Sequence, residues 1–173
     1  HFFPDQLGFN FERYLQFGQF PQPVVDVENF PESETLDYLQ KIENKVIEFD
    51  LPKSFPIQRI DVLRLIFSYV KQSSGNVLVY ENLTNDLGVD IRTTIKYIDW
   101  LKQAFLIDIC LNQTKKMVKA ARTAKKIYLT STNFGSSTIA SRVETYVFNL
   151  LKQTSLPVEF YRFQNQEIDF ITS

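Results

Sequence analysis

The sequence predicts an α+β protein built from three successive units. Apolar residues recur at helical spacing up to about residue 105, and two short apolar segments follow at 106–110 and 126–130. From residue 159, two runs of alternating apolar and polar residues joined by a turn predict a β-hairpin. We therefore predict a helical acidic segment over residues 1–57, a winged helix-turn-helix over 58–131 and a partial α/β unit over 132–173.

The first unit combines a short helix with a longer amphipathic one. Residues 10–17 predict the short helix, and the proline-rich segment after it predicts a packed loop. A longer helix opens after Pro31, with acidic residues in its first turn, where they favour the helix dipole. We expect this helix to end before Pro52 and to bury the apolar positions Leu36, Leu39, Ile42, Val46 and Ile47.

The second unit has the order of a winged helix-turn-helix, three helices followed by two strands. Asp61 is expected to cap the first helix, whose buried face is Leu63, Ile66, Phe67 and Val70 and which ends at Gly75. The second helix spans about 81–87, and Gly88 supplies the positive φ of the turn that follows it. Asp90 caps the third helix, about 91–105, whose predicted inward face is Ile95, Ile98, Leu101 and Phe105.

Charge is distributed unevenly, although the net charge is only -1. Residues 1–50 hold ten acidic side chains against three basic ones, and no acidic residue occurs between Asp108 and Glu144. A basic stretch of this kind favours nucleic acid, and the third helix and the loop between the strands supply candidate contacts. The predicted nucleic-acid-binding residues are Arg92, Thr93, Lys96, Lys115, Lys116 and Lys119.

Other readings of these features remain open. Helix-turn-helix units also dock proteins, and exposed charged faces are often only solvated. Asp99 lies on the same helix face and would repel phosphate. The acidic head, residues 1–50, could also dock on the basic loop between the two predicted strands and mask it from DNA.

The third unit is expected to be incomplete. Val143, Tyr146, Val147, Leu150 and Leu151 mark an amphipathic helix before the hairpin. A hairpin needs a further strand or a covering helix. The chain opens on His1 and ends with the hairpin, so we expect an interior fragment of a longer protein, with an open strand edge that favours homo-oligomers.

Five segments together resemble the C-terminal region of prokaryotic AAA-type P-loop ATPases, a region usually described as a domain of unknown function. These segments are FGQFP at 17–21, the helix-turn-helix at 83–106, KIY at 126–128, the helix at 144–150, and YRF at 161–163 followed by EIDFI at 167–171. The sequence departs from the family pattern at Gln19, where a second Gly is usual, and at Ser131 and Asn133, where Asp and Gly are usual.

The resemblance implies a preceding ATPase domain and a closing restriction-endonuclease-like core. The chain has no G-x-x-x-x-G-K-[ST] motif, so ATP and Mg²⁺ are implied for the parent protein and no cofactor for this chain. Glu144 and Asp169 match the first two acids of the nuclease pattern, as catalytic residues and Mg²⁺ ligands. The third element, Glu-x-Lys, would follow Ser173, so we expect a truncated core that cleaves nothing. The alternative for both acids is an ordinary solvent-facing position.

We therefore expect an accessory region of a larger ATPase whose winged helix contacts double-stranded DNA. The alternative is a protein-interaction or regulatory module with an inactive nuclease-like scaffold, and whether the parent is an active nuclease stays open. A single Cys excludes a disulfide framework, and no apolar run approaches the roughly 20 residues of a membrane span. We expect a cytoplasmic protein with no membrane partner, adjoining its ATPase domain.

Overall fold

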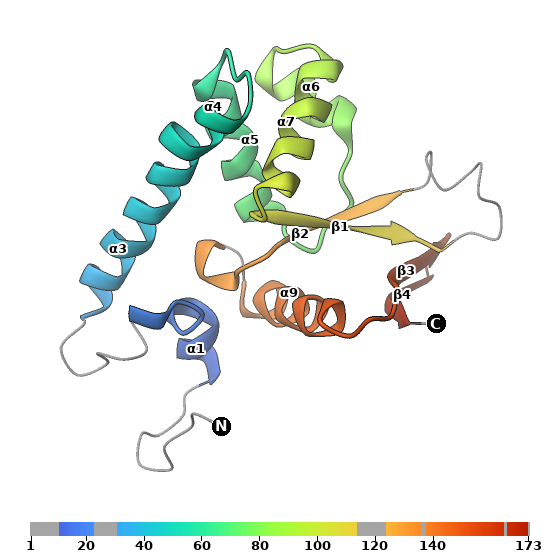
Figure 1. Ribbon diagram of the computed structural model, residues 1–173. Coiled ribbons are helices and arrows are strands. Elements are labelled where there is room, and N and C mark those ends of the chain that lie inside the picture. Colours follow the sequence, from blue (N-terminus) through green and yellow to red (C-terminus); the bar gives the residue numbers. More distant parts are fainter. Residues whose placement is uncertain (1–10, 23–30, 114–123, 136–137, 165, 173) are drawn as a thin grey trace.

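The computed structural model describes residues 11–22, 31–113, 124–135, 138–164 and 166–172, and it shows helices followed by a mixed sheet (Figure 1). The predicted α+β class is confirmed at this level. The helices of the first half are α1 (Phe11–Phe17), α3 (Glu32–Lys45), α4 (Leu51–Ser54), α5 (Ile60–Ser73), α6 (Tyr80–Leu87) and α7 (Ile91–Gln103). No helix in the described part of the chain has both the length and the apolar character that crossing a bilayer requires.

The long helix does not stop before Pro52, and this expectation was wrong. After α3 the chain passes through a π-helical turn, η1 (Val46–Asp50), directly into α4, which carries Pro52 in its first turn. Proline is tolerated there because a first-turn N–H needs no partner within the helix, and the π turn shifts the register that the ring would otherwise disrupt. Leu39 and Ile47 are buried as expected, whereas Leu36 is exposed.

The three helices α5, α6 and α7 pack around one apolar core. The predicted face of α5, the turn at Gly88 with φ 61° and the cap at Asp90 are confirmed, since Asp90 accepts hydrogen bonds from the N–H groups of Arg92 and Thr93. Asp61 does not cap α5, because it lies inside the first turn and binds Arg59. On α7, Ile98 and Leu101 are buried as predicted.

Two positions expected on the inward face of α7 are exposed instead, namely Ile95 and Phe105. Thr94 and Tyr97 are buried in their place, so the inward face is rotated relative to the prediction. The helix also ends earlier than expected, at Gln103, which puts Phe105 in the turn beyond it. Apolar spacing alone could not distinguish these two arrangements.

The sheet joins the second predicted unit to the third. Its strand order is β2 (Lys125–Leu129), β1 (Ile107–Asn112), β3 (Val158–Phe163), β4 (Gln166–Thr172). β1 pairs antiparallel with β2 and parallel with β3, so the final hairpin has a partner strand within the chain. The expectation that the hairpin lacks a partner strand was wrong, although β4 does form the open edge.

Helices cover this sheet on opposite sides, with α7 above β1 and β2 and α9 (Ile139–Lys152) below them in Figure 1. Below the sheet, Phe148 of α9 packs in a small core with Cys110, Tyr128 and Phe160. Val147 and Leu150, expected on the buried face of α9, are exposed.

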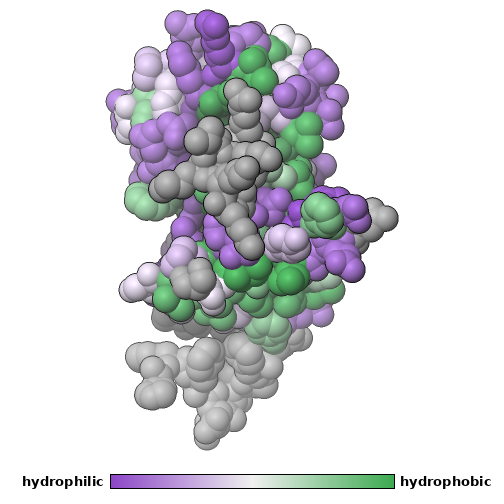
Figure 2. Space-filling view, turned by 90° about the vertical axis from the view of Figure 1, so that its right-hand side faces the viewer, coloured by the Kyte–Doolittle hydropathy of each residue, from purple (hydrophilic) through white to green (hydrophobic). Residues whose placement is uncertain are grey.

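Hydrophobic side chains gather on one part of the surface. Figure 2 shows them over the lower half of the molecule, where α9 and the hairpin lie, with mainly hydrophilic side chains above. On the hairpin, Ile168 is 53% exposed. Phe170 packs against Tyr128 and Phe148.

Candidate functional site

A buried lysine joins three carboxylates where β2, α9 and β4 meet. The Nζ atom of Lys126 lies 3.0 Å from Glu144, 2.6 Å from Glu167 and 2.9 Å from Asp169. The Lys126 side chain is 4% exposed, whereas the three carboxylates are partly open to solvent. We call these four residues the Lys126 cluster.

The local structure explains why the four side chains converge. Lys126 and Tyr128 alternate along β2 and therefore point to the same face of the sheet, the face that α9 covers. Glu144 reaches from α9 toward the sheet, and its Oε1 atom accepts hydrogen bonds from Lys126 and, at 2.7 Å, from the Tyr128 hydroxyl. Glu167 and Asp169 are alternate residues of β4 and share one face.

The phenol ring of Tyr128 is fixed by packing beneath the cluster. It stacks on Phe148 with centroids 4.2 Å apart. Thr145, the residue after Glu144, shares a buried hydrogen bond of 2.8 Å with Ser74, which ties the end of α5 to α9. Glu144 is therefore held on a helix that is fixed from two directions.

The electrostatics of the cluster favour a charged lysine. Burial alone would lower the pKa of Lys126, but the hydrogen bonds that Lys126 donates to Glu167, Asp169 and Glu144 outweigh it and raise the pKa above its usual range. Burial, reinforced by the hydrogen bond to Glu144, also raises the pKa of Tyr128. Three carboxylates face one ammonium group, and Arg162, 3.5 Å from Glu167, offsets part of the excess negative charge.

Glu144 and Asp169, the predicted catalytic acids and metal ligands, are thus brought together by the fold. The ammonium group of Lys126 binds both, so a divalent cation would compete with it for the same oxygen atoms. Within the described ranges, no group of three or more His, Cys, Asp or Glu residues has the arrangement of a metal site. The residues as arranged do not fit a resident Mg²⁺, and the metal assignment stays a prediction.

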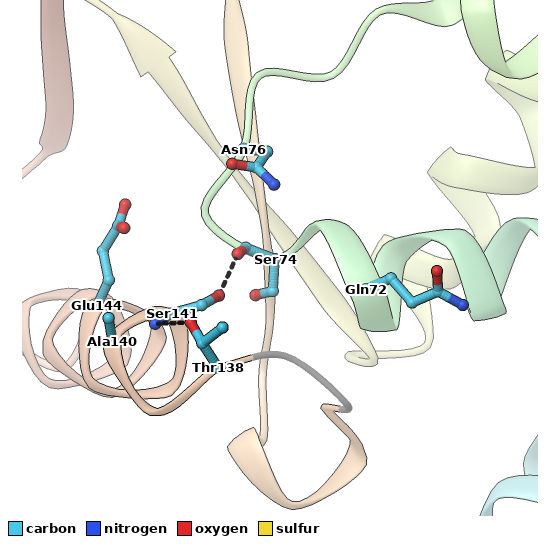
Figure 3. Close-up of a pocket in the computed structure, with 7 residues that line it drawn as sticks. All are labelled: Gln72, Ser74, Asn76, Thr138, Ala140, Ser141 and Glu144. Atoms are coloured by element: carbon cyan, nitrogen blue, oxygen red, sulfur yellow. Dashed lines mark hydrogen bonds between the residues drawn. The ribbon is translucent and has the colours of Figure 1, made fainter.

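Two cavities flank Glu144. The first has a volume of about 610 Å³ and is lined mainly by polar residues, as Figure 3 shows. In it the Ser141 hydroxyl donates to the carbonyl of Ser74, and Thr138 caps α9. Its lining residues are Gln72, Ser74, Asn76, Thr138, Ala140, Ser141 and Glu144. The second, about 520 Å³, is an apolar groove between α9 and β4 that includes Val143, Val147, Asp169 and Phe170.

The predicted nucleic-acid contacts on α7 form a separate region. Arg92 and Lys96 are exposed, and neither side chain makes an ion pair with another described residue. The Thr93 hydroxyl is bound to Asp90, and Asp99 accepts a hydrogen bond from Gln103. Lys115, Lys116 and Lys119 lie outside the described residues.

The sequence did not predict Lys126, the residue at the centre of the cluster, as part of a site. Lys126 was counted with the basic stretch, and Tyr128 and Glu167 were given no role. The available signal was Lys126 itself, which alternates with Tyr128 along the strand and flanks the apolar residue Ile127. A lysine on the buried face of a strand needs carboxylate partners, and the sequence offered several.

Comparison with known proteins identifies one family. No curated protein and no solved structure matches the sequence. The family profile described as a domain of unknown function (DUF8612) matches residues 8–137, which include the helical units, β1 and β2. Lys126 lies inside the matched stretch, whereas Glu144, Glu167 and Asp169 lie beyond it. The chain therefore belongs to the DUF8612 family.

Proposed function

We propose that α5, α6 and α7, with β1 and β2, act as a winged helix-turn-helix that contacts duplex DNA, as an accessory region of a larger AAA-type ATPase. The observation that carries this proposal is the exposed pair Arg92 and Lys96 on α7. Recognition helices of this class meet DNA through their N-terminal residues, where this pair lies.

The arrangement of α7 supports this role. Tyr97, Ile98 and Leu101 fix the helix to the core, so its opposite face is presented on a rigid support. Tyr97 also accepts a hydrogen bond from the N–H of Arg59 before α5. Beside the two cations, half-exposed Ile91 and Ile95 offer apolar surface for sugar or thymine methyl groups.

The test is a titration of duplex DNA at about 50 mM and about 200 mM salt, with binding strongest at the lower salt. In the double variant Arg92→Ala/Lys96→Ala, we expect the slope of log affinity against log salt to fall by roughly 2, one for each lost phosphate contact. The matched control is Lys41→Ala/Lys45→Ala, which removes the same charge from exposed positions on α3. No binding at about 50 mM salt, or an equal loss in the control, contradicts the proposal.

A second candidate function is a protein-interaction or regulatory module in which α9, β3 and β4 form an inactive nuclease-like scaffold. It is favoured by Lys126, which binds both carboxylates that a nuclease would need for Mg²⁺. We expect millimolar Mg²⁺ to leave plasmid DNA intact and to leave the melting temperature unchanged. Cleavage that is lost in Glu144→Gln would contradict this candidate.

A separate experiment tests whether the acidic residues 1–50 mask the proposed DNA-binding surface on α7. Deleting residues 1–50 would remove Leu15, Leu39 and Ile47, which are buried, so the deletion would damage the core. Neutralising exposed acids on α3 with Glu32→Gln, Glu34→Gln and Asp37→Asn leaves that packing intact. Unchanged DNA affinity in this variant would show that the helix α3 does not mask the DNA-binding surface.

A further inference from the structure

Two helices of the protein end in the same type of turn, but with different residues at its critical position. At the end of α6, the N–H groups of Gly88 and Val89 donate to the carbonyls of Asn85 and Thr84. At the end of α7, the N–H groups of Phe105 and Leu106 donate to the carbonyls of Lys102 and Leu101. Both are Schellman turns, which require a left-handed residue immediately after the helix.

Glycine suits this position, and phenylalanine does not. Gly88 has φ 61°, and Phe105 has φ 57°. A bulky residue in this region is a conformational outlier because its Cβ crowds the backbone, whereas glycine has no Cβ. The turn itself explains the left-handed backbone at position 105, but it does not explain the choice of phenylalanine.

The side chain gains nothing from the fold in return. Phe105 is 82% exposed, the highest value among the large exposed hydrophobic residues of the described chain. Its ring makes no contact with another aromatic ring in the described part of the protein. By contrast, its neighbour Leu106 is buried, as the apolar contact of a Schellman turn requires. Both the backbone cost and the exposure point to a contact outside the chain.

The surroundings of Phe105 carry positive charge. Lys102 lies three residues before it, and Asp108 three residues after it. The Nζ atom of Lys152 is 3.0 Å from the Asp108 carboxylate, and that of Lys102 is 3.9 Å from it. Two half-exposed lysines thus share one carboxylate, so these three side chains together carry a net charge of +1.

We propose that Phe105 is a stacking platform for an unpaired base of single-stranded nucleic acid, with Lys102 and Lys152 binding the adjacent phosphates. An exposed aromatic ring beside cations is the arrangement by which proteins hold single strands without reading their sequence. This contact is separate from the duplex contact at Arg92 and Lys96. Arg92 is 11 residues before Gln103, the last residue of α7, or about 16 Å along the helix at 1.5 Å per residue, and Phe105 lies beyond that end.

The experiment uses the full chain and a short oligodeoxythymidine carrying one 2-aminopurine, whose fluorescence falls when the base stacks. We expect binding at about 50 mM salt with quenching, roughly tenfold weaker binding in Phe105→Ala, and retained binding in Phe105→Trp. Phe163→Ala is the matched control, since Phe163 is another exposed phenylalanine, at 59%, on the distant hairpin. Phe105→Gly should bind weakly yet melt about 2–4 °C higher, because it relieves the strained backbone.

Each outcome decides the proposal. Equal binding by the wild type, Phe105→Ala and Phe163→Ala overturns it, as does the absence of quenching. A lower melting temperature for Phe105→Gly would show that the ring supports the fold, which removes the premise. Loss of duplex binding in Arg92→Ala/Lys96→Ala with single-strand binding retained would show that the two contacts are independent. If Phe105→Gly is more stable but no strand binds to the wild type, the nucleic-acid proposal fails.

Discussion

Two cations, Arg142 of α9 and Lys126 of β2, are bound in different environments. Arg142 donates to the backbone carbonyls of Thr132, at 2.7 Å, and of Gly135 and Leu15, and no described carboxylate pairs with it. Lys126 instead binds three carboxylates from two elements. One cation is held by neutral dipoles, and the other by opposite charges.

The two arrangements do different work in the molecule. The carbonyls around Arg142 belong to α1, to the 3-10 turn η2 (Thr132–Phe134) and to the residue after it, so Arg142 fixes the N-terminal helix to the rest of the fold. These acceptors carry no charge that pH can change. The Lys126 cluster has excess negative charge and partly exposed carboxylates, so its stability depends on its own ionisation. We regard the Arg142 contacts as purely structural and the Lys126 contacts as ones whose strength depends on pH.

The largest expected effect is from Lys126→Met. This variant leaves three carboxylates close together with no ammonium between them. Removing one partner of a buried ion pair costs about 3–5 kcal/mol, and we expect about 3 kcal/mol here because the carboxylates can still be hydrated. Urea unfolding measures this loss.

The matched control is Lys41→Met, which changes an exposed lysine of α3. It should alter the free energy of unfolding by no more than about 0.5 kcal/mol. A loss in Lys126→Met that is no larger than in this control would show that the cluster is not a stabilising site and would remove the distinction from Arg142.

The second expected effect is from Arg142→Met. The carbonyls that it releases lie at a partly buried junction, and hydrogen bonds to a charged group are worth about 1.5–3 kcal/mol. We expect a loss of about 2 kcal/mol, with faster amide exchange in α1 and no change in the Lys126 cluster. Uniform exchange changes across both regions would mean that the two cations belong to one cooperative unit.

The Arg142 junction also contains the three residues at which the sequence was expected to depart from the pattern of the ATPase resemblance. The side chain of Gln19 accepts from the Ser131 hydroxyl at 2.9 Å and from the Thr132 N–H at 2.8 Å, while its backbone N–H donates to Asn133 at 2.9 Å. Gln19, Ser131 and Asn133, the three unusual residues, thus contact one another.

Gln19→Ala should have a smaller effect than either cation variant. It removes both side-chain hydrogen bonds and leaves the buried Thr132 N–H without a protein acceptor. A lost bond of this kind costs about 1 kcal/mol. Thermal unfolding measures this loss, with Gln40→Ala on the exposed side of α3 as the control. An unchanged melting temperature would mean that the contact is incidental.

Local features of the fold were predictable, and contacts between distant segments were not. The Asp90 cap, the Gly88 turn and the final hairpin depend on neighbouring residues, and all three were predicted. The parallel pairing of β1 with β3 joins residues almost 50 positions apart, and no local pattern specifies it. Lys126 was misread for the same reason, since its partners come from α9 and β4. Phe105 was predicted to face inward because it continues the helical spacing of apolar residues past the point where the helix ends.

The smallest expected effect is a difference in pH dependence between the contributions of Lys126 and Arg142 to the free energy of unfolding. Because the folded state raises the pKa of Lys126, its stabilisation is complete below the unfolded pKa of about 10.4 and is lost as pH rises above it. Between pH 7 and about pH 10.5 the loss should reach about 0.5 kcal/mol. Tyr128 titrates in the same direction, but it is present in both the wild type and Lys126→Met, so the difference between these proteins reports Lys126. We expect that difference to shrink over this range and the difference between the wild type and Arg142→Met to stay constant. A constant difference for Lys126→Met would show that the three carboxylates do not hold the proton on the lysine.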